Sequence, residues 1–165
     1  MSFTNSLLTS LVLSAILAAP AHADWQGVPF GVTDDELPSY VPDARPNENR
    51  EKDDEDLAAL MTMPYNVGDI EADAYFKFDA ERRLQEVELV IRSLEDCSSA
   101  LLGVARVYGP SEDETDLNGY AVIYNYRDQE NGNLVSVLAP SSPTSTLDCS
   151  VNYRPFPTGG EPGGF

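Results

Sequence analysis

Residues 70–78 read IEADAYFKF, and this stretch decides the fold because apolar and polar residues alternate along it. A period of two residues is typical of a β-strand with one buried face. The polar residues 79–83 follow as a turn, and Val87, Leu89 and Ile91 then repeat the same alternation. The two stretches therefore predict an antiparallel hairpin.

Working outward from this hairpin, residues 93–108 predict one long helix. Apolar residues recur there at three- and four-residue spacing until Gly109-Pro110 ends the pattern. Alternation returns at 122–127, at 134–139 after the turn signal Asn131-Gly132, and at 147–154. Before the hairpin, residues 57–63 fit either a short helix or a strand, and Thr33 precedes an acidic turn that favours a short N-terminal helix.

These elements predict an α+β domain. We expect an antiparallel sheet of about five strands in ββαβββ order, with one main helix packed on a face and a short N-terminal helix before it. Residues 24–56 form an N-terminal segment with the short helix and an acidic loop, and 57–154 form the α+β domain. Residues 155–165 are rich in Gly and Pro, which predicts a disordered tail.

The first 23 residues are typical of a secretory signal peptide. An apolar run over 7–19 is followed by Pro20-Ala21-His22-Ala23, so we expect cleavage after Ala23 and a periplasmic or secreted protein. The run is shorter than the roughly 20 apolar residues that a membrane-spanning helix needs. We therefore expect no membrane span in the mature chain.

Cys97 and Cys149 are the two cysteines of the chain. Thiols of exported proteins are normally oxidised, so one intramolecular disulfide is expected. Cys97 lies on the apolar stripe of the predicted helix and Cys149 on the apolar face of the last strand. The bond would therefore join helix to sheet.

The net charge of −18 excludes two classes of partner. A field of this sign repels the phosphates of nucleic acids and anionic lipid surfaces. It favours a protein partner, and a basic one in particular. The alternative is that the acidic excess only keeps the protein soluble.

The residue types also limit catalysis. The single histidine, His22, lies in the predicted signal peptide, so the mature chain has no imidazole for a catalytic triad or a metal site. The cysteines are assigned to the disulfide, and no glycine-rich phosphate loop lies between a strand and a helix. We therefore expect neither a cofactor nor an enzyme, with paired carboxylates as the remaining route to hydrolysis.

One acidic stretch partly matches a calcium-binding loop. Glu114, Asp116 and Asn118 follow the first half of an EF-hand loop. Asn125 stands where that motif needs a bidentate Glu, so the match is weak. A solvated acidic loop is the alternative, and we expect no other metal site.

Exposed aromatic and charged residues suggest a contact surface. Tyr and Trp are frequent interface anchors, although tyrosines in half-buried strands are also ordinary core residues. The candidate surface combines such residues with the acidic run of the N-terminal segment: Trp25, Asp53, Asp54, Glu55, Asp56, Tyr75 and Lys77.

The expected order of elements resembles, in fold alone, small envelope modules such as outer-membrane assembly lipoproteins and β-lactamase-inhibitor-like domains. This chain lacks the lipidation cysteine of the first group, and no inhibitory residue of the second can be matched to it. We expect an exported, non-catalytic protein-binding module, an inhibitor of or adaptor for another envelope or secreted protein. The alternatives are a structural or assembly protein of the envelope and a carboxylate-dependent hydrolase.

Overall fold

The computed structural model describes residues 23–49 and 57–156, and strands dominate this part of the chain. The elements follow in this order: β1 (Asp24–Trp25), β2 (Val28–Pro29), α1 (Leu37–Tyr40), β3 (Arg45–Pro46), β4 (Ala58–Val67), β5 (Ile70–Phe78), β6 (Leu84–Ile91), the 3₁₀ turn η1 (Leu94–Asp96), α2 (Cys97–Tyr108), β7 (Asp113–Asp116), β8 (Ala121–Asp128), β9 (Asn133–Pro140) and β10 (Cys149–Pro155).

The expectation of a five-stranded α+β domain is wrong, because the protein is mostly β. Eight strands form one antiparallel sheet in the order β3-β4-β5-β6-β10-β9-β8-β7, and β1 and β2 form a separate hairpin. The strands expected from alternation are present, and 70–78 coincides with β5. The expectation falls short because the sheet also contains β3, β4 and β7.

Strand β4 covers the stretch that fitted either a helix or a strand. It pairs with β5 from Ala58↔Phe78 to Val67↔Ile70, and this long ladder overrides the helical preference of its Ala, Leu and Met residues. Pro64 lies past the two residues of β4 that pair with β3, where β4 itself forms the edge of the sheet. A proline is tolerated at such a position.

Strand β7 replaces the expected acidic loop. Its sequence is Asp-Glu-Thr-Asp, which has no apolar alternation, and the ladder to β8 (Asp113↔Asn125 to Asp116↔Val122) holds it in place. It is the last strand of the sheet, and charged side chains on an edge strand discourage pairing with another chain.

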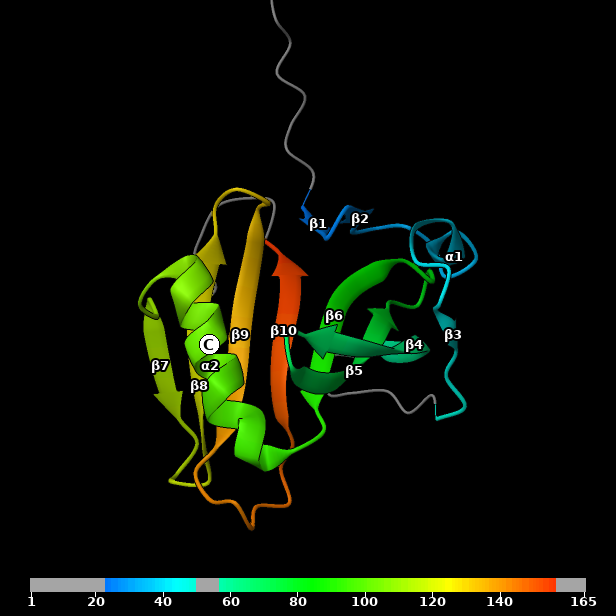
Figure 1. Ribbon diagram of the computed structural model, residues 1–165. Helices are drawn as coiled ribbons and strands as arrows, with labels where there is room; N and C mark the ends of the chain where they lie inside the picture. Colours follow the sequence, from blue (N-terminus) through cyan, green and yellow to red (C-terminus); the bar gives the residue numbers. More distant parts are fainter. Residues whose placement is uncertain (1–22, 50–56, 157–165) are drawn as a thin grey trace, which may run out of the picture.

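The C-terminal strand β10 lies in the middle of the sheet. It separates two meanders, β3 to β6 and β7 to β9, and Val151 pairs with Leu89 on one side and Val137 on the other. Figure 1 shows β10 between β9 and β6, with α2 lying across the β8–β9 half. Helix α2 is thus the connection between the two meanders.

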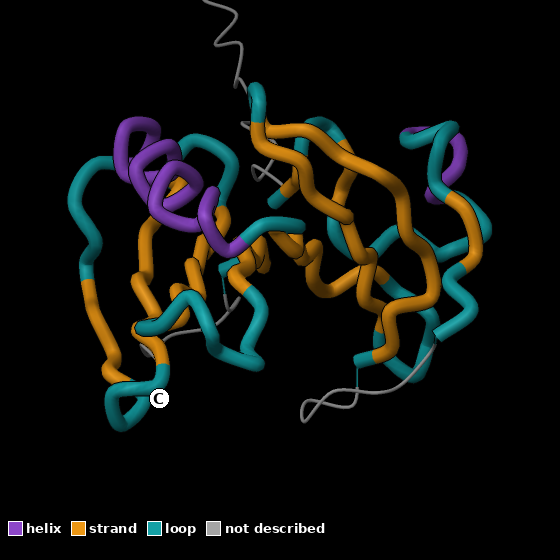
Figure 2. The backbone as a smooth tube through the Cα atoms, turned by 60° about the horizontal axis from the view of Figure 1, so that its bottom comes forward, coloured by secondary structure: helices purple, strands orange, loops and turns teal. Residues whose placement is uncertain are grey.

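A single core covers one face of the sheet, and the N-terminal segment belongs to it. The hairpin turn Gln26-Gly27 has positive φ at both residues, as a tight two-residue turn requires. It directs Trp25 onto the sheet, where its ring centroid lies 5.4 Å from that of Tyr65 and 5.7 Å from that of Phe76. The N-terminal segment does contain a short helix, α1, but it begins at Leu37, after the acidic turn that follows Thr33, and it lies at the opposite side of the molecule from α2 (Figure 2).

The predicted disulfide is confirmed. Cys97 and Cys149 are bonded, with their Cα atoms 5.8 Å apart. The bond joins the first residue of α2 to the first residue of β10. It therefore ties the helix to the central strand of the sheet, as the sequence pattern predicted.

Several predictions fall on residues 1–22, 50–56 and 157–165, which lie outside the described part of the chain. They are the signal peptide, the acidic run Asp53, Asp54, Glu55 and Asp56, and most of the predicted tail. Pro155, where that tail was expected to begin, ends β10. Among the described residues, no helix has the length and apolar character needed to cross a membrane.

Candidate functional site

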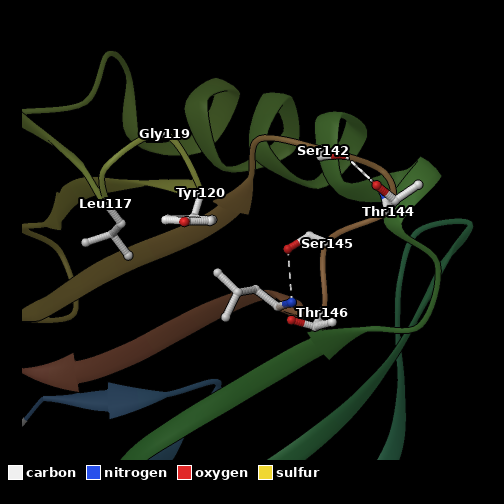
Figure 3. A pocket seen from close by; sticks show the side chains of 8 residues that line it. Leu117, Gly119, Tyr120, Ser142, Thr144, Ser145 and Thr146 are labelled. Atoms are coloured by element: carbon white, nitrogen blue, oxygen red, sulfur yellow. Dashed lines mark hydrogen bonds between the residues drawn. The ribbon is translucent and has the colours of Figure 1, made fainter.

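A cavity of about 630 Å³ opens where two loops meet at one end of the sheet. One loop joins β7 to β8 and the other joins β9 to β10, and their side chains face each other across a gap (Figure 3). We call this the loop cleft. It is lined by Leu117, Gly119, Tyr120, Ser142, Thr144, Ser145, Thr146 and Leu147.

The first wall of the loop cleft is a hairpin turn. Asn118 and Gly119 both have positive φ, and the Tyr120 amide donates to the Leu117 carbonyl at 3.1 Å. These features define a tight two-residue turn, for which Asn-Gly is the preferred sequence. The Ser141 amide donates to the Tyr120 carbonyl at 2.9 Å, which ties the second loop to the first.

The second wall is the β9–β10 loop, which is rich in hydroxyl groups that form hydrogen bonds within the loop. The Ser142 and Thr144 hydroxyls are hydrogen-bonded at 2.9 Å, and Ser145 Oγ accepts from the Leu147 amide at 3.0 Å. These bonds satisfy backbone and side-chain groups within the loop, and none of them links a hydroxyl to a basic side chain. These hydroxyl groups therefore hold the β9–β10 loop in shape.

The loop cleft is apolar at its centre and acidic around it. Tyr120 is 73 % exposed, and Leu147 is also exposed on the facing loop. None of the lining residues is charged, whereas the next residues along the chain, Asp116 and Asp148, are exposed carboxylates. An exposed aromatic ring beside a cavity offers a contact for an apolar side chain, and the acids around it favour a basic partner surface.

The calcium candidates lie beside this cleft but make other contacts. Glu114 accepts from the Ser111 hydroxyl at 2.8 Å, and Asp116 accepts from the Gly119 amide at 2.7 Å. Asn118 belongs to the tight turn. Within residues 23–49 and 57–156, no three acidic, His or Cys side chains are grouped closely enough to hold a metal ion.

Tyr75 and Lys77 lie on the sheet face opposite the core, as alternation predicted. Lys77 is mostly buried, with its Nζ 2.8 Å from Glu86 Oε1 and 3.1 Å from Glu88 Oε2. Burial by itself would lower the pKa of Lys77, but the hydrogen bonds and charges of the two carboxylates raise it well above the usual range. Lys77 thus belongs to an ion-pair network.

Glu86 is the centre of that network. It is 0 % exposed and lies between Lys77 of β5 and Arg154 of β10, whose Nε also donates to it. The network joins β5 and β6 of the first meander to the central strand β10.

The assignment of Trp25 to a contact surface is corrected by its burial. Trp25 is 4 % exposed and packs against Phe76, on the core face of the strand that carries Tyr75 and Lys77 on its other face. The sequence candidates therefore do not converge on one site. Sequence reasoning missed Tyr120 and Leu147, although Asn118-Gly119 carries the same hairpin signal as Asn131-Gly132.

The same sheet face supports a prediction about acid stability. Arg92 donates from Nη2 to Asp73 Oδ1 at 2.7 Å and from Nε to Oδ2 at 2.9 Å, and this hydrogen bonding lowers the pKa of Asp73. A lowered carboxyl pKa contributes stability above the unfolded-state value of about 4, and the contribution is lost as the pH falls.

Unfolding by urea between about pH 6 and pH 2 should therefore show a shallower acid loss for Asp73→Asn than for the wild type. Asp148→Asn, which removes an exposed carboxylate outside this pair, is the control and should follow the wild type. Equal acid slopes for Asp73→Asn and the wild type would contradict the role of the Arg92 pair.

Comparison of the chain with protein-family models, with curated proteins and with solved structures found no match.

Proposed function

We propose that the protein is an exported, non-catalytic protein-binding module, and that the loop cleft receives an apolar side chain of a basic partner. The observation that carries this proposal is the exposure of Tyr120, 73 %, at the side of a cavity of about 630 Å³. Tyrosine is among the residues that contribute most to protein interfaces. As an inhibitor or an adaptor, the module acts by occupying the surface that it binds.

Charge supports a basic partner. The chain carries 28 acidic and 10 basic side chains, and Asp116 and Asp148 lie directly beside the apolar lining of the loop cleft. Opposite charges around a small apolar contact accelerate encounter and fix orientation more than they increase affinity. Binding of this kind weakens with salt, because surface charges are screened over about 10 Å at 0.1 M ionic strength.

Export is supported by the disulfide. Cys97–Cys149 requires an oxidising compartment to persist, and cytosolic chains rarely keep such a bond. The apolar run and small residues that precede Asp24 supply a route to that compartment. Together they support a periplasmic or secreted location.

The experiment compares two exposed tyrosines. Tyr120→Ala removes the ring beside the loop cleft, and Tyr40→Ala removes a ring that is 49 % exposed on α1. The oxidised wild type and both variants are immobilised, and proteins retained from an envelope extract are quantified by mass spectrometry. A hot-spot tyrosine contributes about 2 kcal/mol, so we expect Tyr120→Ala to bind the partner roughly 30-fold more weakly.

A partner counts as specific only if the wild type and Tyr40→Ala retain it equally, Tyr120→Ala loses it, and moderate salt releases it. Thermal unfolding of the three proteins checks that both variants are folded. If every retained protein binds all three baits to the same extent, the loop cleft is not the binding surface.

A further inference from the structure

A second, smaller cavity lies at the other end of β8 from the loop cleft. Its volume is about 260 Å³, and the β1–β2 hairpin, the end of α2, the β8–β9 turn and β10 enclose it. We call it the Asn133 cavity. The lining residues that matter chemically are Asp24, Trp25, Tyr108, Asp128, Asn133 and Tyr153.

Asn133 leaves one buried acceptor unused. Its side chain is 2 % exposed, and its Nδ2 donates to the Asp24 carbonyl oxygen at 2.6 Å. A carbonyl only accepts, so this bond fixes the orientation of the amide and leaves Oδ1 on the other side. Among the described residues Oδ1 has no hydrogen-bond partner, and a buried polar atom in that state costs about 1–3 kcal/mol.

The other polar groups of the Asn133 cavity are also mainly acceptors. Asp128 accepts from the Asn131 amide at 3.1 Å and from its Nδ2 at 2.8 Å, and Asp24 accepts from the Gly27 amide at 2.8 Å. Carboxylate oxygens can each accept further bonds. Among the described residues that line the cavity there is no lysine, arginine or histidine, so the lining includes two carboxylates and no cationic side chain.

The negative charge of Asp128 affects two tyrosines of the cavity. Tyr108 and Tyr153 hydrogen-bond to each other, and the pKa of each is raised, first by burial and also by the charge of Asp128. Their rings and the indole of Trp25 supply apolar walls. The cavity thus combines negative charge, unused acceptors and aromatic surface.

We propose that the Asn133 cavity binds a primary ammonium group. Such a group brings three N–H donors, no acceptor and one positive charge, which matches Asn133 Oδ1 and the carboxylates of Asp24 and Asp128. A sugar hydroxyl fits less well, because each brings an acceptor as well as a donor. Ligand sites for larger molecules measure about 300–1,000 Å³, so the amine is small.

The ammonium group has two possible sources. One is a free small amine, and the other is the α-amino group that the proposed cleavage after Ala23 would create on Asp24. The Asp24 carbonyl already contacts Asn133, and in an extended residue the nitrogen and the carbonyl point to the same strand edge. The site itself does not depend on the loop cleft or on a protein partner.

The test uses the only tryptophan of the chain, Trp25, as the reporter, and methylammonium chloride as the probe. Trp25 fluorescence is titrated in the full chain and in the chain cleaved after Ala23, with sodium chloride as the salt control. In Asp24→Asn the amide oxygen can still accept from Gly27, so the turn is kept while one charge is lost. Asp116→Asn is the control. It also removes one charge and keeps an acceptor for the Gly119 amide, but Asp116 lies away from the cavity.

A saturable response to methylammonium but not to sodium, weakened at least fivefold by Asp24→Asn and unchanged by Asp116→Asn, supports the proposal. Saturation in both chains identifies a free amine as the source. Saturation in the full chain alone, with the α-amine pKa of the cleaved chain raised above the usual value of about 8, identifies the chain's own terminus. No saturable response in either chain, together with an ordinary α-amine pKa, overturns the proposal.

Discussion

Replacing Cys97 and Cys149 together by alanine should lower the free energy of unfolding by about 4 kcal/mol. The disulfide spans a sequence separation of 52 residues, and opening a loop of that length returns a large conformational entropy to the unfolded chain. The total stability of a small protein is about 5–15 kcal/mol, so this loss leaves the fold marginal. Urea unfolding, monitored by the fluorescence of buried Trp25, measures the change.

The control uses a reducing agent. Dithiothreitol should bring the wild type down to the stability of the double variant and should leave the variant itself unchanged. A loss below about 1 kcal/mol would mean that the reduced, unfolded chain keeps enough structure to cancel the entropic effect.

Glu86→Gln should cost roughly 3 kcal/mol, the second of the two largest effects that we expect. Glu86 is fully buried between Lys77 and Arg154, so an uncharged side chain at this position leaves both cations facing a neutral amide. Removing one partner of a buried ion pair is costly because the desolvated charge opposite it loses its compensation. Urea unfolding at neutral pH gives the difference.

Glu88→Gln is the matched control, since Glu88 lies two residues along β6 and also contacts Lys77, at 3.1 Å. Its carboxylate is more exposed, so its loss should cost no more than about 1 kcal/mol. If the two variants lose the same small amount, burial of Glu86 does not determine the strength of the network.

The hairpin and the helix could be predicted because each buries one face. Ala72, Ala74 and Phe76 are fully buried on β5, and Cys97 and Val104 are buried on α2, so their spacing in the sequence reflects the core directly. The agreement of two such patterns at Cys97 and Cys149 also identified the disulfide. Periodicity is informative wherever one side of an element faces the core and the other faces water.

The strands that escaped prediction lack such a pattern. β7 lies at the edge of the sheet with four polar residues, and backbone hydrogen bonds to β8 hold it without any apolar side chain. The acidic residues there predict a solvated loop with a weak match to a calcium site, and this interpretation overlooks Asn118-Gly119 as a hairpin turn. A hairpin at that turn would have implied β7, because β8 was already expected after it.

The residues of the loop cleft could not be predicted, because their exposure depends on long-range packing. Trp25 lies in the two-residue strand β1, and only the sheet that forms from residues 58–155 makes it a core residue. Tyr120 lies in a loop whose neighbour, residues 141–148, is remote in sequence, and their meeting follows from the order of β8, β9 and β10. Residue type alone does not distinguish the two aromatics.

The central position of β10 has a consequence for biosynthesis. A ribosome releases the chain from its N-terminal end, so both meanders emerge before the strand that lies between them. Until residues 149–155 are free, β6 and β9 each present an unpaired edge, and Cys97 has no partner. The sheet can therefore be completed only after residues 149–155 have emerged, because β10 is the strand through which the two meanders are joined.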